Sequence, residues 1–314
     1  NPQVMGTTEP MPSSIQGIYV IGSLAYVADS DAGLRIVDIS TPSAPVEIGA
    51  YDTPGTAVDV FVSGNIAYVA DEISGLRLVD VSTPSAPIEV GFEDTFWGYS
   101  VFVLDGMAYM AGGGGLQIID ISTPSAPARA GSYYTGGHPK DIFVVENTAY
   151  VTAQDGGLRV VDVSKPNAPV GLGAYNTPDG VWDIFVLESI AYVQDSSGSL
   201  VDVSIPSVPV EVGAYDISGA SLGVFVSGNL AYVVAGDGLR MVDISTPNTP
   251  NEVGFYGTGG GAYDIFVAGT MAYVAATSGL RILDVSAPSR PIEIGFYSIP
   301  GSSRGVSVVG SLAY

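Results

Sequence analysis

Short runs of apolar residues alternate along the whole chain with clusters of Gly, Ser, Asn, Asp and Pro. In one representative stretch the runs cover residues 58–62, 66–70, 76–81 and 88–92. They are rich in Val, Ile, Leu, Phe and Tyr, and no segment shows apolar periodicity over the length of a helix. The pattern predicts β-strands joined by tight turns.

An Ala-Tyr pair recurs at intervals of 40 to 42 residues, which marks an internal repeat. Each repeat holds four apolar runs, and runs such as 24–28 are apolar on both alternating faces, as in a sheet covered on both sides. Four antiparallel strands per repeat, with sheets packed face to face, predict an all-β fold: a single β-propeller domain spanning 1–314. The pairs end at Tyr26, Tyr68, Tyr109, Tyr150, Tyr192, Tyr232, Tyr273 and Tyr314.

The number of blades follows from the number of strands. Residues 2–6 align with the fourth run of a repeat, seven complete repeats follow, and residues 305–314 supply a first and a second run. We therefore expect eight blades, with residues 1–9 and 305–314 sharing the closing blade; seven blades with spare strands is the alternative. The closing blade lacks one strand, which either follows Tyr314 in a longer chain or comes from a neighbouring molecule by strand addition.

One motif carries a family resemblance. The run Gly-Leu-Arg-Ile-Val-Asp-Ile-Ser at 33–40, followed by Thr-Pro-Ser-Ala-Pro at 41–45, resembles the LVIVD repeat, and similar runs cover nearly the whole chain. The resemblance implies a β-propeller of the kind found in bacterial and archaeal surface proteins. The fifth repeat departs from the motif, since residues 198–202 are one residue short and lack the Arg. We expect a bulge or a weakened strand there.

One face of the propeller repeats almost without change. An Asp such as Asp38 precedes each double-proline turn, and we expect it to accept backbone hydrogen bonds within that turn. Arg35 stands opposite Glu47 on the neighbouring strand, and other repeats preserve the pair, which predicts a cross-strand ion pair. Both features indicate structural roles.

The blade-to-blade loops on the other face differ from repeat to repeat. Aromatic and cationic residues on variable loops above a rigid scaffold are typical of a binding face. Aromatic rings stack on sugars and on apolar side chains of proteins. The candidate residues for binding a ligand or partner are Phe96, Trp97, Tyr99, His138, Lys140, Trp182, Tyr263 and Arg304.

The composition narrows the classes of function. The chain carries 32 acidic residues against 10 Lys and Arg, a net charge of −22, so it offers no basic face for nucleic acid. It has no Cys, which excludes disulfides and thiolate metal sites, and no apolar run long enough to span a membrane. A surface built from Ser, Thr, Gly and Asp favours an extracellular or cell-surface location.

The sequence holds no catalytic motif. His138 is the single histidine, no nucleophile elbow surrounds any Ser, and the glycine-rich run 257–262 precedes a strand rather than a phosphate-binding helix. We therefore expect no catalytic residues and no enzymatic activity. Paired carboxylates could still cleave glycosides, but among so many acids the sequence singles out no pair.

Two acidic features bear on cofactors. Residues 29–33 resemble the start of a calcium loop but lack the later ligands, so calcium is a weak alternative to the expected absence of cofactors and metals. The second feature lies where the innermost strands begin. Its four carboxylates either attract a cation or bond the backbone of the next repeat, and the second role is favoured; they are Asp59, Asp141, Asp183 and Asp264.

These patterns together predict a non-catalytic extracellular or cell-surface propeller, either an interaction module or a structural scaffold. Its protein or glycan partner would bind the variable loop face. The first alternative is a propeller that binds or cleaves glycans. The second is an oligomer, a surface filament assembled by complementing the incomplete blade with a strand.

Overall fold

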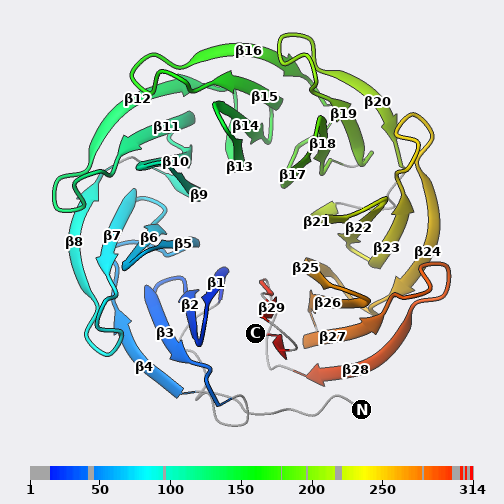
Figure 1. Ribbon diagram of the computed structural model, residues 1–314, viewed down its shortest axis with the longest axis horizontal. Coiled ribbons are helices and arrows are strands. Elements are labelled where there is room, and N and C mark those ends of the chain that lie inside the picture. The colour runs from blue at the N-terminus through cyan, green and yellow to red at the C-terminus, as the bar shows by residue number, and fades with distance from the viewer. Residues whose placement is uncertain are drawn as a thin grey trace.

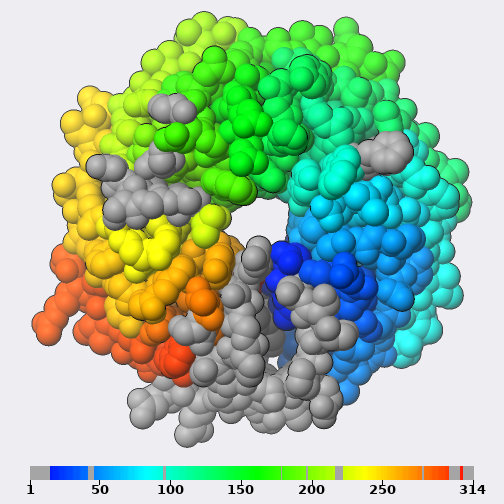
Figure 2. Space-filling view, turned by 180° about the vertical axis from the view of Figure 1, so that it is seen from behind, coloured from blue at the N-terminus to red at the C-terminus, as the bar shows by residue number. Residues whose placement is uncertain are grey.

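The computed structural model describes residues 15–41, 46–94, 97–177, 179–195, 197–215, 221–277, 279–298, 305–306, 308–309 and 312–313. These residues form a ring of radial β-sheets around a central channel (Figure 1). The channel opens through the middle of the molecule (Figure 2). None of the described residues belongs to a helix long and apolar enough to cross a membrane. The predicted all-β propeller is confirmed.

Seven sheets have four antiparallel strands each, in chain order from the channel outward. The first three blades are β1 (Gly17–Ile21), β2 (Leu24–Ala28), β3 (Leu34–Asp38), β4 (Val46–Tyr51); β5 (Asp59–Ser63), β6 (Ile66–Ala70), β7 (Leu76–Asp80), β8 (Ile88–Glu93); and β9 (Gly98–Leu104), β10 (Met107–Gly112), β11 (Gly115–Asp120), β12 (Ala128–Tyr134). The next two are β13 (Pro139–Val145), β14 (Thr148–Ala153), β15 (Gly157–Asp162), β16 (Val170–Tyr175); and β17 (Ile184–Leu187), β18 (Ile190–Val193), β19 (Ser199–Asp202), β20 (Val210–Ala214). The last two are β21 (Ser221–Ser227), β22 (Leu230–Ala235), β23 (Gly238–Asp243), β24 (Asn251–Gly257); and β25 (Ala262–Ala268), β26 (Met271–Ala276), β27 (Gly279–Asp284), β28 (Ile292–Ser298).

The expected count of eight blades is wrong, because the residues that the structure describes form seven four-stranded blades. After β28 the described residues supply only a two-stranded sheet, β29 (Val308–Val309) with β30 (Leu312–Ala313). A blade needs four strands, so this sheet does not complete one. β29 contacts both β1 and β25 and thereby lies between the first and the seventh blade. The predicted contribution of residues 1–9 falls outside the described residues.

The hydrophobic core lies between neighbouring blades. One cluster joins Leu34 and Ile36 of the first blade to Val60 and Val69 of the second, all buried, and similar clusters recur around the ring. Burying a side chain of this size contributes about 2–3 kcal/mol. The apolar residues on both faces of each sheet therefore hold the ring together, as the two-sided pattern predicts. In the fifth blade, β19 is four residues long, shorter than the third strand of the other blades, in line with the weakened strand predicted there; β17 and β18 are also four residues long.

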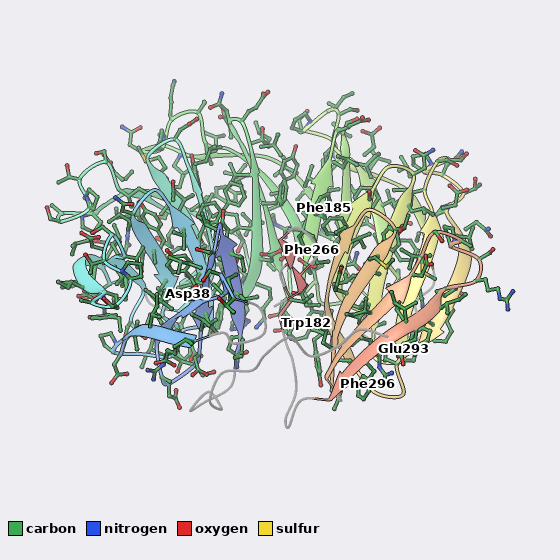
Figure 3. All side chains as sticks on the ribbon, turned by 60° about the horizontal axis from the view of Figure 1, so that its bottom comes forward. Asp38, Trp182, Phe185, Phe266, Glu293 and Phe296 are labelled. Carbon is green, nitrogen blue, oxygen red and sulfur yellow. The ribbon has the colours of Figure 1, made fainter. Side chains whose placement is uncertain are left out.

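The innermost strands carry a belt of aromatic rings. Each blade contributes one ring at the same strand position, and neighbouring centroids lie 4.9 to 6.0 Å apart. Tilted pairs at this spacing attract each other through their quadrupoles. In Figure 3, Phe185 and Phe266 lie near the middle of the molecule, whereas Phe296 lies on an outer strand. The belt consists of Tyr19, Phe61, Phe102, Phe143, Phe185, Phe225 and Phe266.

Contacts that recur from blade to blade stabilise the repeating face. Asp38 Oδ1 accepts a hydrogen bond from the Ser40 amide at 2.8 Å, and the equivalent Asp does so in every blade, as predicted. A glycine in the fourth strand also meets the proline turn of the next blade. A Cβ on Gly91 would lie only 2.1 Å from the Pro124 carbonyl oxygen. The predicted ion pair between Arg35 and Glu47 is confirmed, at 3.6 Å.

Candidate functional site

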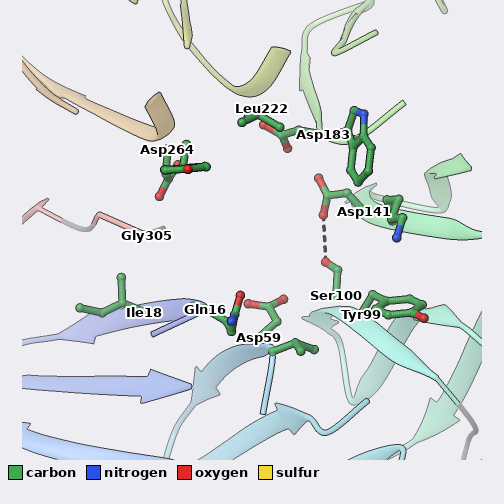
Figure 4. A pocket seen from close by; sticks show the side chains of 15 residues that line it. Gln16, Ile18, Asp59, Tyr99, Ser100, Asp141, Asp183, Leu222, Asp264 and Gly305 are labelled. Carbon is green, nitrogen blue, oxygen red and sulfur yellow. Dashed lines mark hydrogen bonds between the residues drawn. The ribbon is translucent and has the colours of Figure 1, made fainter. Parts of the chain in front are cut away.

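The candidate site is the end of the channel where the innermost strands begin, which we call the channel mouth. It contains an open cavity of about 340 Å³. Four carboxylates at equivalent strand positions converge on this cavity from four blades (Figure 4). We call them the acid ring: Asp59, Asp141, Asp183 and Asp264.

Each carboxylate of the acid ring bonds the backbone of the following repeat. Asp59 Oδ2 accepts from the Val101 amide at 2.9 Å, and Asp183 Oδ2 accepts from the Val224 amide at 2.9 Å. Asp141 and Asp264 make the same contact with the following repeat, at 3.2 and 2.8 Å. The favoured prediction for these acids, a bond to the next repeat's backbone, is confirmed. The contacts fix the direction in which each carboxylate points.

Proton affinity in the acid ring is raised. Burial raises the pKa of Asp59 to about 6, and the nearby Asp141 charge adds to the effect. Burial likewise raises the pKa of Asp264 to about 6. Burial and the Asp141 charge raise the pKa of Asp183 well above its usual range. Burial, reinforced by the Asp141 charge at Asp59 and Asp183, therefore makes these carboxyl groups bind a proton more readily than exposed ones do.

An aromatic pair at the edge of the cavity holds an ammonium group. Lys140 Nζ lies 4.8 Å from the centroid of the Tyr99 ring and 5.3 Å from that of the Trp182 ring. These distances allow a cation–π interaction with both rings. Trp97 stacks on Tyr99 at 6.4 Å and has a backbone φ of 64°, a region that non-glycine residues seldom occupy. Trp97 and Trp182 remain 47% and 40% exposed.

The structure brings together most of the sequence-predicted site residues. Trp97, Tyr99, Lys140 and Trp182 form one connected group, and Tyr263 lines the same cavity. His138 does not line the cavity: its Nδ1 lies 2.9 Å from Asp155 Oδ2, and both side chains are exposed. The remaining two candidates, Phe96 and Arg304, lie outside the described residues.

Sequence reasoning missed several lining residues. Among them, Gln16, Val58 and Leu222 carry no chemistry that marks a site on its own. The signal that finds them is positional, because each stands one residue before the acid ring position of its repeat. Six residue types occupy this position in the seven blades, and only Tyr occurs twice. We call this set the lip: Gln16, Val58, Tyr99, Lys140, Trp182, Leu222 and Tyr263.

The calcium-loop resemblance at residues 29–33 leads to no cluster of ligands. Asp29 is fully buried, with Oδ2 3.9 Å from Arg35 Nε, and Asp31 accepts a hydrogen bond from Thr56 at 3.1 Å. Within the part of the chain that the structure describes, no three His, Cys, Asp or Glu side chains lie close enough to hold a metal ion. The acid ring forms no such group either.

A family model described as the LVIVD repeat matches seven consecutive segments, one for each blade. The predicted resemblance is confirmed. No curated protein sequence matches the chain significantly. The matched segments are residues 13–53, 54–95, 99–135, 136–177, 180–217, 218–258 and 259–298.

Solved propellers share the fold at low identity. The computationally designed Ika8 protein superposes with a TM-score of 0.82 at 12% identity, over 99% of this chain and 96% of Ika8. Saccharomyces cerevisiae Sqt1 also gives 0.82, at 8% identity over 98% and 92%. Chaetomium thermophilum Sqt1, solved bound to the N-terminus of ribosomal protein L10, gives 0.72 at 13% identity over 90% and 88%. At these identities the similarity concerns the fold alone.

Proposed function

The chain belongs to the LVIVD-repeat family, and we propose that it is a non-catalytic interaction scaffold that binds its partner at the channel mouth. The observation that carries the proposal is the lip. Its seven positions carry six residue types, with only Tyr occurring twice, whereas the core, turn and blade-contact positions repeat. Core packing, turns and blade contacts account for the repeating positions, but none of these accounts for the lip. A rigid ring that presents non-repeating side chains is suited to recognition.

The acid ring supports binding over catalysis. Every carboxylate in it is already tied to the backbone of the next repeat. A general acid or base must exchange protons with a substrate at close range. A carboxylate that also links two repeats is better suited to providing a fixed charge than to exchanging protons with a substrate. The exposed rings of Trp97 and Trp182 then supply contact area around the charged cavity.

The partner in this proposal is a peptide segment of another protein, met outside the cell or at its surface. The cavity has room for a few side chains rather than for a folded domain. The acidic, lysine-poor composition supports the location. The fold supports a peptide partner by analogy, since a propeller of similar fold has been solved with a protein N-terminus bound.

A random peptide library displayed on phage tests the proposal. The wild-type chain should enrich peptides whose affinity falls about tenfold on Trp97→Ala or Trp182→Ala. Tyr134→Ala is the matched control, because Tyr134 is an exposed aromatic residue on the outermost strand β12, and it should leave binding unchanged. Peptides that bind both Trp variants as well as wild type would refute the site. A glycan array run with the same variants would reveal a sugar partner instead.

A second candidate, assembly into a filament, has one supporting observation. Leu280 and Ile282 of the seventh blade are half-buried, whereas their equivalents Leu239 and Met241 are fully buried. A strand from a second copy could cover them by strand addition. Sedimentation velocity over a hundredfold range of concentration tests this. A mass that rises with concentration supports assembly, and a constant monomer mass excludes it.

A further inference from the structure

We propose that the channel mouth receives an arginine side chain of the partner peptide, with the guanidinium inside the acid ring and the peptide backbone across the lip. This inference rests on the proposed function and specifies its partner. The geometry combines a cavity of about 340 Å³, a wall of aromatic faces and four inward carboxylates. An arginine side chain matches all three, since it is long, planar and always charged.

The charge of the cavity is not balanced from within. Lys140 is the one cation among the described lining residues, set against four carboxylates. Its ammonium contacts the rings of Tyr99 and Trp182, and no described carboxylate oxygen lies within 4.0 Å of it. The rings of Tyr99 and Trp182 thus already contact one ammonium group, that of Lys140. The acid ring forms no ion pair with a described cation. A cationic ligand supplies the missing charge.

The carboxylates are fixed and still have capacity to accept. Asp59 Oδ2 accepts from the Val101 amide and its Oδ1 from the Val60 amide, so the group cannot turn away from the cavity. Each oxygen has a second lone pair for an incoming N–H. The side chains of the site therefore need little ordering when a ligand binds. Because that ordering costs little free energy, a charge-assisted hydrogen bond contributes most of its strength to the affinity.

The arrangement of the acids favours a guanidinium over a metal ion. No three of the described His, Cys, Asp or Glu side chains form a group that could hold a metal ion. A guanidinium presents five N–H donors in a plane and can reach more than one carboxylate. Its flat faces also stack on rings such as Tyr99 and Trp182.

Short capped peptides test the proposal by isothermal titration calorimetry at pH 7.5. The probes are Gly-Gly-Arg-Gly-Gly and the same peptide with citrulline, which keeps the shape of arginine and removes its charge. We expect the arginine peptide to bind at least about tenfold more tightly than the citrulline peptide. Equal affinity of the two peptides, or no heat from either at millimolar concentration, would overturn the proposal.

Three variants locate the binding. Asp59→Asn should weaken binding of the arginine peptide by about tenfold, because it replaces the carboxylate with a neutral carboxamide of the same shape. Glu146→Gln makes the same change of charge directly after strand β13, at the end of that strand away from the channel mouth. It should have no effect on binding. Lys140→Gln should strengthen binding, because it removes a competing cation and frees two rings. Loss of binding in Lys140→Gln, with an unchanged melting temperature, would contradict the arrangement.

The outcomes separate this inference from the function on which it rests. If selected phage peptides depend on Trp97 and Trp182 but contain no Arg, the scaffold function stands and the arginine pocket is wrong. If the arginine peptide binds but Asp59→Asn and Glu146→Gln weaken its binding equally, attraction is due to net charge and the pocket is again wrong. Dependence on both Asp59 and Trp182 supports the pocket.

Discussion

Asp264 Oδ2 accepts a hydrogen bond from the Val306 amide at 2.8 Å. The same contact joins Asp59 to Val101 and Asp183 to Val224, so the segment at Val306 is joined to the seventh blade as a following repeat would be. Asp264 thus links this segment to the seventh blade. Each acid of the ring connects two successive repeats and also places a carboxyl group at the channel mouth.

Replacing Asp264 with Ala should loosen the segment around Val306. Loss of a hydrogen bond to a charged acceptor removes about 1–3 kcal/mol, so amide exchange at Val306 should speed up by about tenfold or more. Hydrogen exchange resolved to single residues measures this. Asp59→Ala serves as the control, because it should affect Val101 and leave Val306 unchanged. Unaltered exchange at Val306 in Asp264→Ala would show that the segment is held by other contacts.

Stability should be greatest in mildly acidic solution. The raised pKa values of Asp59 and Asp264, about 6, favour the folded state at low pH, and this contribution disappears as the pH rises from about 4 through 6. The Asp residues that precede the proline turns affect stability in the opposite way. Hydrogen bonds from Ser40 lower the pKa of Asp38 in the folded state. Asp38 therefore stabilises the fold at pH values above its ordinary pKa, and this stabilisation disappears as the pH falls.

Melting temperatures between pH 3 and pH 8 check this expectation. The wild-type curve should peak near pH 4 to 5 and decline on both sides. Asp59→Asn should flatten the decline between pH 4 and 6, since the amide does not titrate, and should leave the acid side unchanged. A wild-type curve that still rises above pH 6 would contradict the assignment.

Gly91→Ala should destabilise the protein by about 1–3 kcal/mol, because its Cβ would overlap the Pro124 carbonyl oxygen of the next blade. Chemical denaturation measures the change in free energy. Gly236→Ala is the matched control: a Cβ there meets nothing within 4 Å, so the change should stay within about 0.5 kcal/mol. Equal effects at both glycines would mean that the close approach does not limit packing.

Leu239→Ala should cost about 2–5 kcal/mol, because Leu239 is fully buried between blades. The equivalent Leu280 is only half-buried, so Leu280→Ala should cost clearly less. The pair is compared by denaturation at low and high protein concentration. If Leu280→Ala matched Leu239→Ala only at high concentration, a second copy would be covering the seventh blade.

The repeat pattern predicts most of the fold because equivalent residues make equivalent contacts in every blade. Leu34 and Leu76 are both fully buried at the same strand position, and Asp38 and Asp80 accept the same hydrogen bond in the same kind of turn. The blade number could not be predicted by counting, since apolar runs near the chain ends do not show whether they join one sheet. Residues 308–313 form only a pair of strands.

The candidate site was predictable in part. Trp97, Tyr99, Lys140 and Trp182 stand out as rare residue types on variable loops, and the structure brings them together. Val58 and Leu222 could not be recognised by type, because apolar residues are common throughout the chain. The sandwich around Lys140 also joins three different blades, and its distances depend on how the blades are placed around the channel.

The contact of Gly91 with Pro124 has an evolutionary consequence. The glycine belongs to one blade and the proline to the next, yet nearly every repeat carries both, as Gly49 with Pro84 and Gly131 with Pro166 show. A newly duplicated repeat therefore meets a complementary neighbour on each side without further mutation. The propeller could grow by copying a single unit, while the lip position in each copy remained free to diverge.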